Sequence, residues 1–173
     1  MKSYFIHILF FTLFVGSYSY AQKLEIYTND DKEEYLGCLN CDAKDSKSIW
    51  NNMGAYGNLY NKKSIWNKYG VYGDNTSNLS PWNPHAEKPP IIKKDGKKYG
   101  YFTLNKFVGQ RVEISLTKML YDYYMDIRED VTKWSKNASE ITTNEAALKL
   151  ANEATKRSTN DDIKKKIQST SKQ

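Results

Sequence analysis

Histidine and cysteine are both scarce in this chain of 173 residues, which contains two of each. His7 lies in the N-terminal apolar segment, which leaves His85 as the only histidine of the remaining chain. Two cysteines and one histidine are too few for a structural zinc site, which takes four protein ligands. His85 stands in "NPHAEKPP", where the neighbouring prolines are typical of an exposed loop, so a catalytic triad around it is not favoured. We therefore expect no catalytic residue, no metal site and no cofactor, and we do not expect an enzyme.

Long apolar runs are equally scarce. The longest spans residues 4–15 and is too short for a membrane-spanning helix, which needs roughly 20 residues. Lys2 precedes this run, and the small residues Ser19 and Ala21 follow it, which is the pattern of a cleaved export signal. We expect residues 1–21 to be a signal peptide. The mature protein is then exported, to the periplasm or the extracellular medium, without a transmembrane anchor.

The charge of the chain is only mildly positive. The formal net charge of +6 falls by one, to +5, once Lys2 is removed with the leader. Such an excess suits contact with acidic envelope polymers and does not single out nucleic acid. An envelope protein or a cell-wall polymer therefore remains open as the partner, and we expect no nucleic acid. The chain after the leader has the length of a single domain.

The two cysteines, Cys38 and Cys41, stand three residues apart in "GCLNC". Export places them in an oxidising compartment, where thiols tend to pair. A thioredoxin-like site would need a helix that begins at the first cysteine within a βαβ unit, and the loop-rich sequence after Asn40 offers neither. We expect a disulfide that closes a local turn. Free thiols, and a redox or metal role, are the alternatives.

A repeat is the clearest feature of the sequence. "SIWN" at residues 48–51 and 64–67 is followed in register by "SPWN" at 80–83, and "GAYG" recurs as "GVYG". Serine, asparagine and paired glycines favour turns and short extended pieces over helix. We expect these repeats to build an irregular loop layer.

Two similar segments, "KLEIYTNDDKEEYLGCLN" and "PIIKKDGKKYGYFTLN", flank the repeats. Asp95-Gly96 in the second is a strong hairpin signal, because glycine adopts the positive φ that a tight turn requires. A single hairpin is marginally stable, so we expect both to combine in one small antiparallel sheet. The predicted strands are residues 24–27, 35–39, 91–93 and 99–104.

After residue 109 the apolar residues follow the period of a helix. Steps of three and four place the following residues on one stripe: Leu116, Leu120, Tyr123, Ile127, Val131 and Trp134. We expect one long amphipathic helix over residues 111–136, packed on the sheet or the repeats, with a partner protein or a second copy as the alternative. The sequence at 142–145, "TTNE", predicts a capping box that starts another helix.

Together these features predict an α+β fold. A small antiparallel sheet of two hairpins and the repeat-built loop layer form a domain over residues 22–110, and the amphipathic helix over 111–136 packs on it. Residues 137–173 are a polar helical tail with few apolar side chains, so we expect this tail to be weakly ordered.

The order of "YLGCLN", the repeats, "PPII" and "DGKKYGYFTLN" resembles a family of small exported bacterial proteins. In that family two DGxYLGxL-type hairpins enclose tandem Ser-Ile-x-Asn-x-Tyr-Gly-x-Tyr-Gly repeats. The resemblance covers roughly residues 24–106 and implies export, but no activity and no binding residue. This chain departs from the pattern by carrying tryptophan after isoleucine in the repeats and cysteines after the first hairpin.

The aromatic residues of the repeats are the remaining candidates for function. A row of planar rings can form a compact core or a platform for sugar rings. Irregular glycine-rich segments need a large group to pack around, which favours the core. As the alternative, the rings bind a glycan while Lys93, Lys94, Lys97 and Lys98 meet its acidic groups. The binding residues under that alternative are Trp50, Trp66, Trp82, Tyr56 and Tyr72.

The function predicted on these grounds is that of an exported envelope protein with a structural or interaction role. A glycan- or cell-wall-binding module is the alternative. An enzyme is a third and less favoured alternative. A calcium loop at residues 73–76 is also less favoured, because these residues do not match the twelve-residue ligand spacing of such loops.

Overall fold

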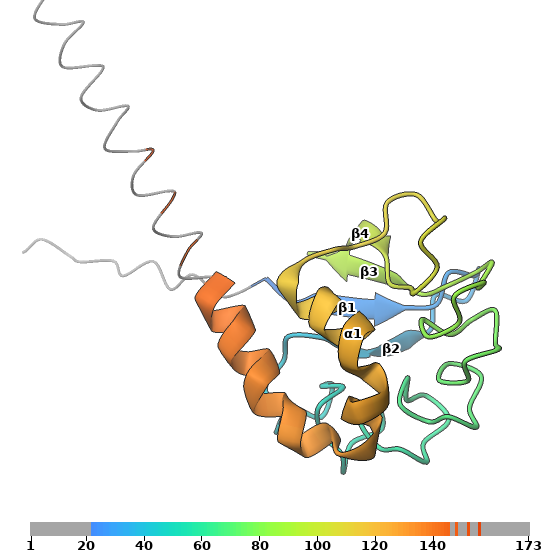
Figure 1. The fold of residues 1–173 in the computed structure, drawn as a ribbon, viewed down its shortest axis with the longest axis horizontal. Helices are drawn as coiled ribbons and strands as arrows, with labels where there is room; N and C mark the ends of the chain where they lie inside the picture. The colour runs from blue at the N-terminus through green and yellow to red at the C-terminus, as the bar shows by residue number, and fades with distance from the viewer. Residues whose placement is uncertain (1–21, 146–147, 149–151, 153–155, 157–173) are drawn as a thin grey trace, which may run out of the picture.

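The computed structural model describes residues 22–145 together with 148, 152 and 156 (Figure 1). The predicted signal peptide lies outside the described residues. So does most of the C-terminal tail, for which weak order was predicted. Among the helices of the described part, none is long and apolar enough to cross a membrane.

The four predicted strands are present and form one antiparallel sheet, which confirms the α+β class. They are β1 (Leu24–Tyr27), β2 (Tyr35–Cys38), β3 (Ile91–Lys94) and β4 (Lys97–Tyr101). The strand order is β2-β1-β3-β4, so the two hairpins meet through their first strands. Leu24, Ile26 and Ile92 lie on the face that enters the core.

The turns of the two hairpins differ as their sequences suggest. Asp95 and Gly96 both have positive φ, 52° and 73°, which is the conformation of a tight primed turn. In the first hairpin Glu33 has φ 43° and donates its N–H to the carbonyl of Asp30 at 3.1 Å. This looser turn is braced by Thr28, whose hydroxyl contacts the Asp30 carboxylate at 2.6 Å.

The repeats form a succession of turns at intervals of about three residues, without helix or long strand. In the first repeat the N–H of Ser48, Asn51 and Gly54 each donates to the carbonyl three residues earlier. Side chains reinforce these turns, because the Ser48 hydroxyl accepts from the N–H of Trp50 at 3.1 Å and the Asn51 amide oxygen accepts from that of Met53 at 3.1 Å. The corresponding residues of the other two repeats make equivalent bonds. Each sequence repeat therefore corresponds to the same series of turns, which the serine and asparagine side chains stabilise.

Glycine is required where each of the first two repeats turns back on itself. A Cβ atom on Gly57 would lie 2.2 Å from the carbonyl oxygen of Asn51, and one on Gly73 would lie 2.2 Å from that of Asn67. Only a residue without a side chain fits this close approach of backbone to backbone.

The loop layer is tied to the sheet at both ends. Cys38 at the end of β2 forms a parallel bridge with Ser48 of the first repeat. Beyond the third repeat, the N–H of Leu104 donates to the carbonyl of Pro81 at 2.7 Å. The repeats therefore continue the sheet rather than form a separate unit.

The single long helix predicted over residues 111–136 is wrong in one respect, because the structure has two helices. The first, α1 (Ser115–Glu129), ends before Asp130, whose φ of −149° and ψ of 84° are not helical. The second begins at residue 131 and runs through 145. Asp130 starts it, since its carboxylate accepts the N–H of Lys133 at 3.0 Å. The short carboxylate competes with the helical hydrogen bonds of its neighbours and favours a cap.

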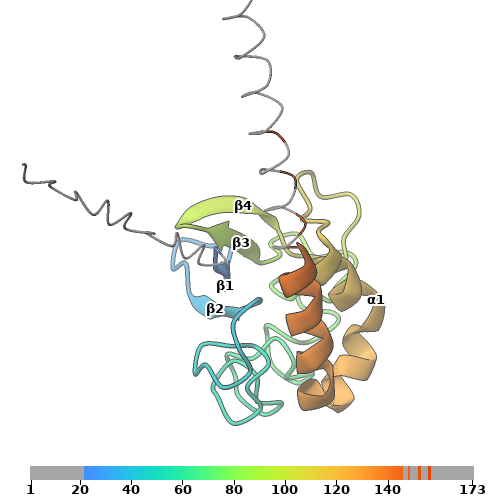
Figure 2. The ribbon, with the colours of Figure 1, turned by 90° about the vertical axis from the view of Figure 1, so that its left-hand side faces the viewer.

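The apolar stripe nevertheless continues across this break. Leu116, Leu120, Ile127 and Val131 are buried, whereas Tyr123 is 47% exposed. Both helices lie on the same side of the sheet, with the repeats at one end of both layers (Figures 1 and 2).

The capping box predicted at residues 142–145 is also wrong, because these residues lie inside the second helix. The hydroxyls of Thr142 and Thr143 donate to carbonyls one turn earlier, at 2.9 and 2.8 Å. The Glu145 carboxylate accepts the N–H of Ser115 at 3.0 Å, so it stabilises the first turn of α1 instead of its own helix.

Candidate functional site

The three repeat tryptophans are core residues that join each repeat to the preceding chain. Trp50, Trp66 and Trp82 are 2%, 0% and 0% exposed. The indole Nε1–H of Trp66 donates to the carbonyl of Ile49 at 2.7 Å, and that of Trp82 donates to Ile65 at 2.5 Å. Trp50 makes the equivalent bond to Leu39 at 2.7 Å. Each buried indole therefore has its polar N–H satisfied, which burial requires.

The same rings form a stack that α1 closes. The ring centroids of Trp50 and Trp66 are 5.9 Å apart, those of Trp66 and Trp82 are 5.4 Å apart, and Tyr124 of α1 lies 4.9 Å from Trp82 with the planes at 6°. Phe102 meets Trp82 edge-on at 5.4 Å. The stack thus joins the loop layer, the sheet and the helix in one core.

The aromatic residues assigned to a glycan platform do not form an exposed platform. The three indoles are buried, and the two tyrosines are partly buried in polar and aromatic contacts. Tyr56 packs edge-on against Tyr35 at 5.0 Å, and the Tyr72 hydroxyl donates to the Glu34 carboxylate at 2.7 Å. Burial and the bond to Glu34 raise the pKa of Tyr72 to about 12.

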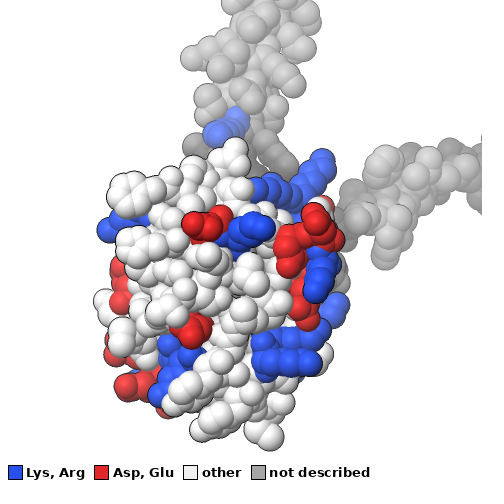
Figure 3. Space-filling view, turned by 90° about the vertical axis from the view of Figure 1, so that its right-hand side faces the viewer, with Lys and Arg blue, Asp and Glu red and all other residues white. Residues whose placement is uncertain are grey.

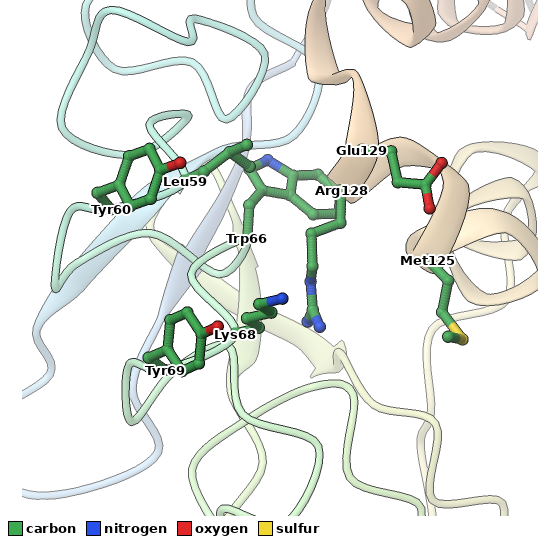
Figure 4. A pocket seen from close by; sticks show the side chains of 8 residues that line it. All are labelled: Leu59, Tyr60, Trp66, Lys68, Tyr69, Met125, Arg128 and Glu129. Atoms are coloured by element: carbon green, nitrogen blue, oxygen red, sulfur yellow. The ribbon is translucent and has the colours of Figure 1, made fainter.

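A hollow of about 470 Å³ lies instead between the C-terminal end of α1 and the loop layer, where the end of the first repeat meets the second (Figure 4). Its volume is in the range of small-ligand sites. Its lining combines aromatic, apolar and charged side chains from both elements: Leu59, Tyr60, Trp66, Lys68, Tyr69, Met125, Arg128 and Glu129.

Two tyrosines at the rim of this hollow are unusually exposed. Tyr60 is 84% and Tyr69 is 80% exposed. Their backbone N–H groups donate to the side chains of Asn58 and Asn67, at 2.8 and 3.1 Å, so the turns of the repeat hold both tyrosines outward. In Figure 4 their hydroxyl ends are directed toward the hollow. Large exposed aromatic rings beside a concavity are typical of a binding site.

Arg128 is a polar group of the hollow that other parts of the protein contact directly. Its guanidinium donates to the carbonyl of Gly73 at 2.6 Å and contacts the amide oxygen of Asn75 at 3.4 Å. It also lies 5.5 Å from the centre of the Tyr124 ring, which is the end of the aromatic stack. Burial lowers the pKa of Arg128. Its Nε is buried without a hydrogen-bond acceptor among the described residues.

Lys68 supplies a second cation to the hollow. Its Nζ lies 5.1 Å from the centre of the Tyr69 ring. Within the described part of the chain neither Lys68 nor Arg128 forms an ion pair. Figure 4 places the Glu129 carboxylate away from both cations, on the α1 side of the hollow. The site therefore offers two exposed tyrosine side chains, two cations and one separate acceptor, a combination that suits binding of a polar ring compound.

Sequence reasoning missed this hollow because it depends on α1 meeting the second repeat. The repeats nevertheless contain one sequence feature that is related to this site. Tyr69 and Met53 occupy equivalent positions, sixteen residues apart, and both are exposed bulky residues, at 80% and 88%. This exposure marks Tyr69 as a candidate but does not locate the hollow, because Met53 at the equivalent position does not line it.

The basic hairpin of β3 and β4 forms as predicted, with its lysines paired across the strands. Lys93 is opposite Lys98, and Lys94 is opposite Lys97. Lys93 is also bound to Glu33 at 2.7 Å, and Lys98 lies 3.7 Å from the centre of the Tyr101 ring. Figure 3 shows positive and negative side chains interspersed on one face of the molecule. On that face, the basic side chains therefore do not form a continuous positive surface that would bind a polyanion.

The cysteines are paired as predicted. Cys38 and Cys41 form a disulfide with a Cα–Cα distance of 5.5 Å. His85 lies exposed on a turn of the third repeat. The described residues contain no group of three His, Cys, Asp or Glu side chains that could hold a metal ion.

Comparison with protein-family models, with curated proteins and with solved structures found no match to this chain.

Proposed function

We propose that this chain is an exported protein of the bacterial envelope with a structural or interaction role rather than a catalytic one. The leader-like N-terminal sequence, the paired cysteines and the resemblance to small exported repeat proteins support this location.

This proposal rests on the different roles that the side chains of the repeats have in the structure. Serine and asparagine hold the turns, and the indoles fill the core, so these residues have internal roles. The exposed residues at the end of the first repeat and in the second are therefore left to contact a partner at the hollow beside α1. We propose that this hollow is the interaction site.

Export is tested by expressing the whole chain with its own leader in a bacterial host and separating periplasm, membranes and medium. We expect the protein outside the cytoplasm, with an intact mass that starts near Gln22. Retention of the leader, with all the protein in the cytoplasm, would contradict the proposed location.

A glycan is the second candidate partner, and a specific observation favours it. Exposed tyrosine rings next to charged side chains can pack on the apolar faces of sugar rings while the charges bind the hydroxyls. Tyr60 and Tyr69 provide such rings, and Lys68, Arg128 and Glu129 provide the charges.

The glycan proposal predicts retention of the exported protein on purified cell wall or on one of a small panel of insoluble polysaccharides. We expect Tyr60→Ala combined with Tyr69→Ala to reduce the retained fraction at least about fivefold, because each stacked ring contributes about 1 kcal/mol. Met53→Ala is the matched control, since Met53 is equally exposed at the equivalent position of the first repeat but does not line the hollow. No retention above that of an unrelated protein, or equal retention of the double variant, would remove this candidate.

A further inference from the structure

The charges of the hollow indicate which saccharides it accepts, and this inference rests on the proposed glycan-binding role. We propose that the hollow binds a saccharide that carries a carboxylate, with the acid group beside Lys68 and Arg128 and the sugar ring against Tyr60 and Tyr69.

The two cations of the hollow, Lys68 and Arg128, favour a negatively charged ligand. Neither forms an ion pair with a carboxylate in the described part of the chain, and the acidic neighbour of Arg128 is Asp74, whose charge opposes the lowering of the Arg128 pKa by burial without forming such a pair. In Figure 4 the Lys68 amine and the Arg128 guanidinium both extend to the middle of the hollow. Two unpaired cations in a partly enclosed site favour an anion over a neutral group.

Arg128 is held in place before a ligand arrives. Its bond to the Gly73 carbonyl and its contact with Asn75 fix the guanidinium, so little side-chain entropy is lost on binding. Arginine presents five N–H donors, and these two contacts use only part of them. A carboxylate matches the planar donor set of a guanidinium better than a single hydroxyl does.

The remaining lining explains why the ligand is a sugar and not a simple anion. The tyrosine rings and the Met125 side chain, which is 63% exposed, offer apolar area that a small inorganic anion would leave in water. Glu129 on the α1 side can accept hydrogen bonds from sugar hydroxyls, and it would repel a second acid group placed there.

The test is calorimetric titration of the full exported protein with the methyl glycoside of galacturonate, which carries one carboxylate, and with the methyl ester of the same compound, which has the same ring without the charge. We expect the acid to bind at least about tenfold more tightly than the ester, which is the effect of one charge-assisted hydrogen bond. Raising the salt concentration from about 0.05 to about 0.5 M should weaken binding of the acid and leave the ester unchanged. Lys68→Met should remove most of the preference, whereas Lys44→Met should not change it, because Lys44 is exposed, precedes the first repeat and does not line the hollow.

Three results would overturn the inference: equal affinity for acid and ester, an unchanged preference in Lys68→Met, or no binding of either compound. The cell-wall retention experiment is separate. Tyrosine-dependent retention on neutral polysaccharide, together with equal affinity for acid and ester, would keep the glycan-binding role and exclude the carboxylate.

Discussion

At the residue scale, one partly exposed acid, Glu34, connects the repeats to the first hairpin. The Glu34 carboxylate accepts a hydrogen bond from the Tyr72 hydroxyl at 2.7 Å and pairs with Lys63 at 3.0 Å. The hydroxyl of Tyr72, and then Lys63, hold the pKa of Glu34 below its ordinary value. Tyr72 was assigned to binding in the alternative interpretation of the sequence, but its hydroxyl has this internal partner.

This contact predicts a loss of stability in acid. Because the pKa of Glu34 is lower in the folded than in the unfolded protein, the stabilisation is complete above the unfolded value, about 4.3 to 4.5, and is lost as pH falls through the folded value. We expect Glu34→Gln to lower the free energy of unfolding by about 1 kcal/mol at neutral pH, and to make it less dependent on pH below about 4.5. Urea unfolding between pH 3 and pH 7, about the range in which carboxylates titrate, measures both effects.

Glu87→Gln is the control for this prediction, because Glu87 is exposed and forms no ion pair among the described residues. Identical acid unfolding of Glu34→Gln and the unmodified protein would contradict the assignment.

At the scale of elements, the turn between β2 and the first repeat is held in two ways. The disulfide joins Cys38 to Cys41. Independently, the Asn40 side chain accepts the N–H of Leu24 at 2.8 Å and donates to the carbonyl of Gln22 at 2.9 Å. The amide therefore fixes the turn against β1 without the sulfur atoms.

We predict that the disulfide forms but is not required for folding. The loop that it closes is very short, so its loss should lower the free energy of unfolding by only about 1 to 2 kcal/mol. Cys38→Ala with Cys41→Ala should remain folded, as measured by near-ultraviolet circular dichroism and urea unfolding. Intact mass after alkylation should show both thiols protected unless reductant is added. Two freely alkylated thiols without reductant, or an unfolded double variant, would show that this prediction is wrong.

At the scale of the whole molecule, the aromatic stack makes the layers interdependent. It begins at the first repeat, passes through all three and ends on Tyr124 of α1, while Phe102 after β4 contacts the same indole as Tyr124. Glu145 of the second helix is bound to the start of α1, so the helices are also joined to each other. We therefore expect sheet, repeats and helices to unfold together.

Acrylamide quenching of tryptophan fluorescence tests this arrangement. Trp134→Phe leaves only the three repeat indoles as emitters, since the chain contains four tryptophans. Because the three are at most 2% exposed, we expect blue-shifted emission and quenching at least about fivefold weaker than in urea. Emission and far-ultraviolet circular dichroism should change at the same urea concentration if the unit is cooperative. Free quenching in the native protein would contradict the buried stack.

Much of the fold follows from local sequence. Asp95-Gly96 predicts its turn because few residues adopt consecutive positive φ values, and the structure has that turn. The spacing of the repeats predicts a periodic layer, since serine and asparagine bond to backbone groups only two residues away. The cysteine pair follows in the same way from its short separation and the expected compartment.

The parts that sequence reasoning missed depend on residues that are distant in the chain. The break at Asp130 interrupts an apolar stripe of unchanged period, so periodicity alone could not locate it. Glu145 belongs to a motif typical of its own helix start, yet its partner is Ser115, thirty residues earlier. The hollow exists only where α1 approaches the second repeat.

The sequence by itself therefore determined the hairpins, the turn-rich repeat and the disulfide, because these depend on interactions between neighbouring residues. The tertiary structure alone decided that Trp66 is buried in the core while Tyr69, three residues later, is exposed at the rim of the hollow. Both are large aromatic residues of one repeat. Their different exposure comes from which side of the turn meets the preceding repeat and α1, and packing between distant elements sets that geometry.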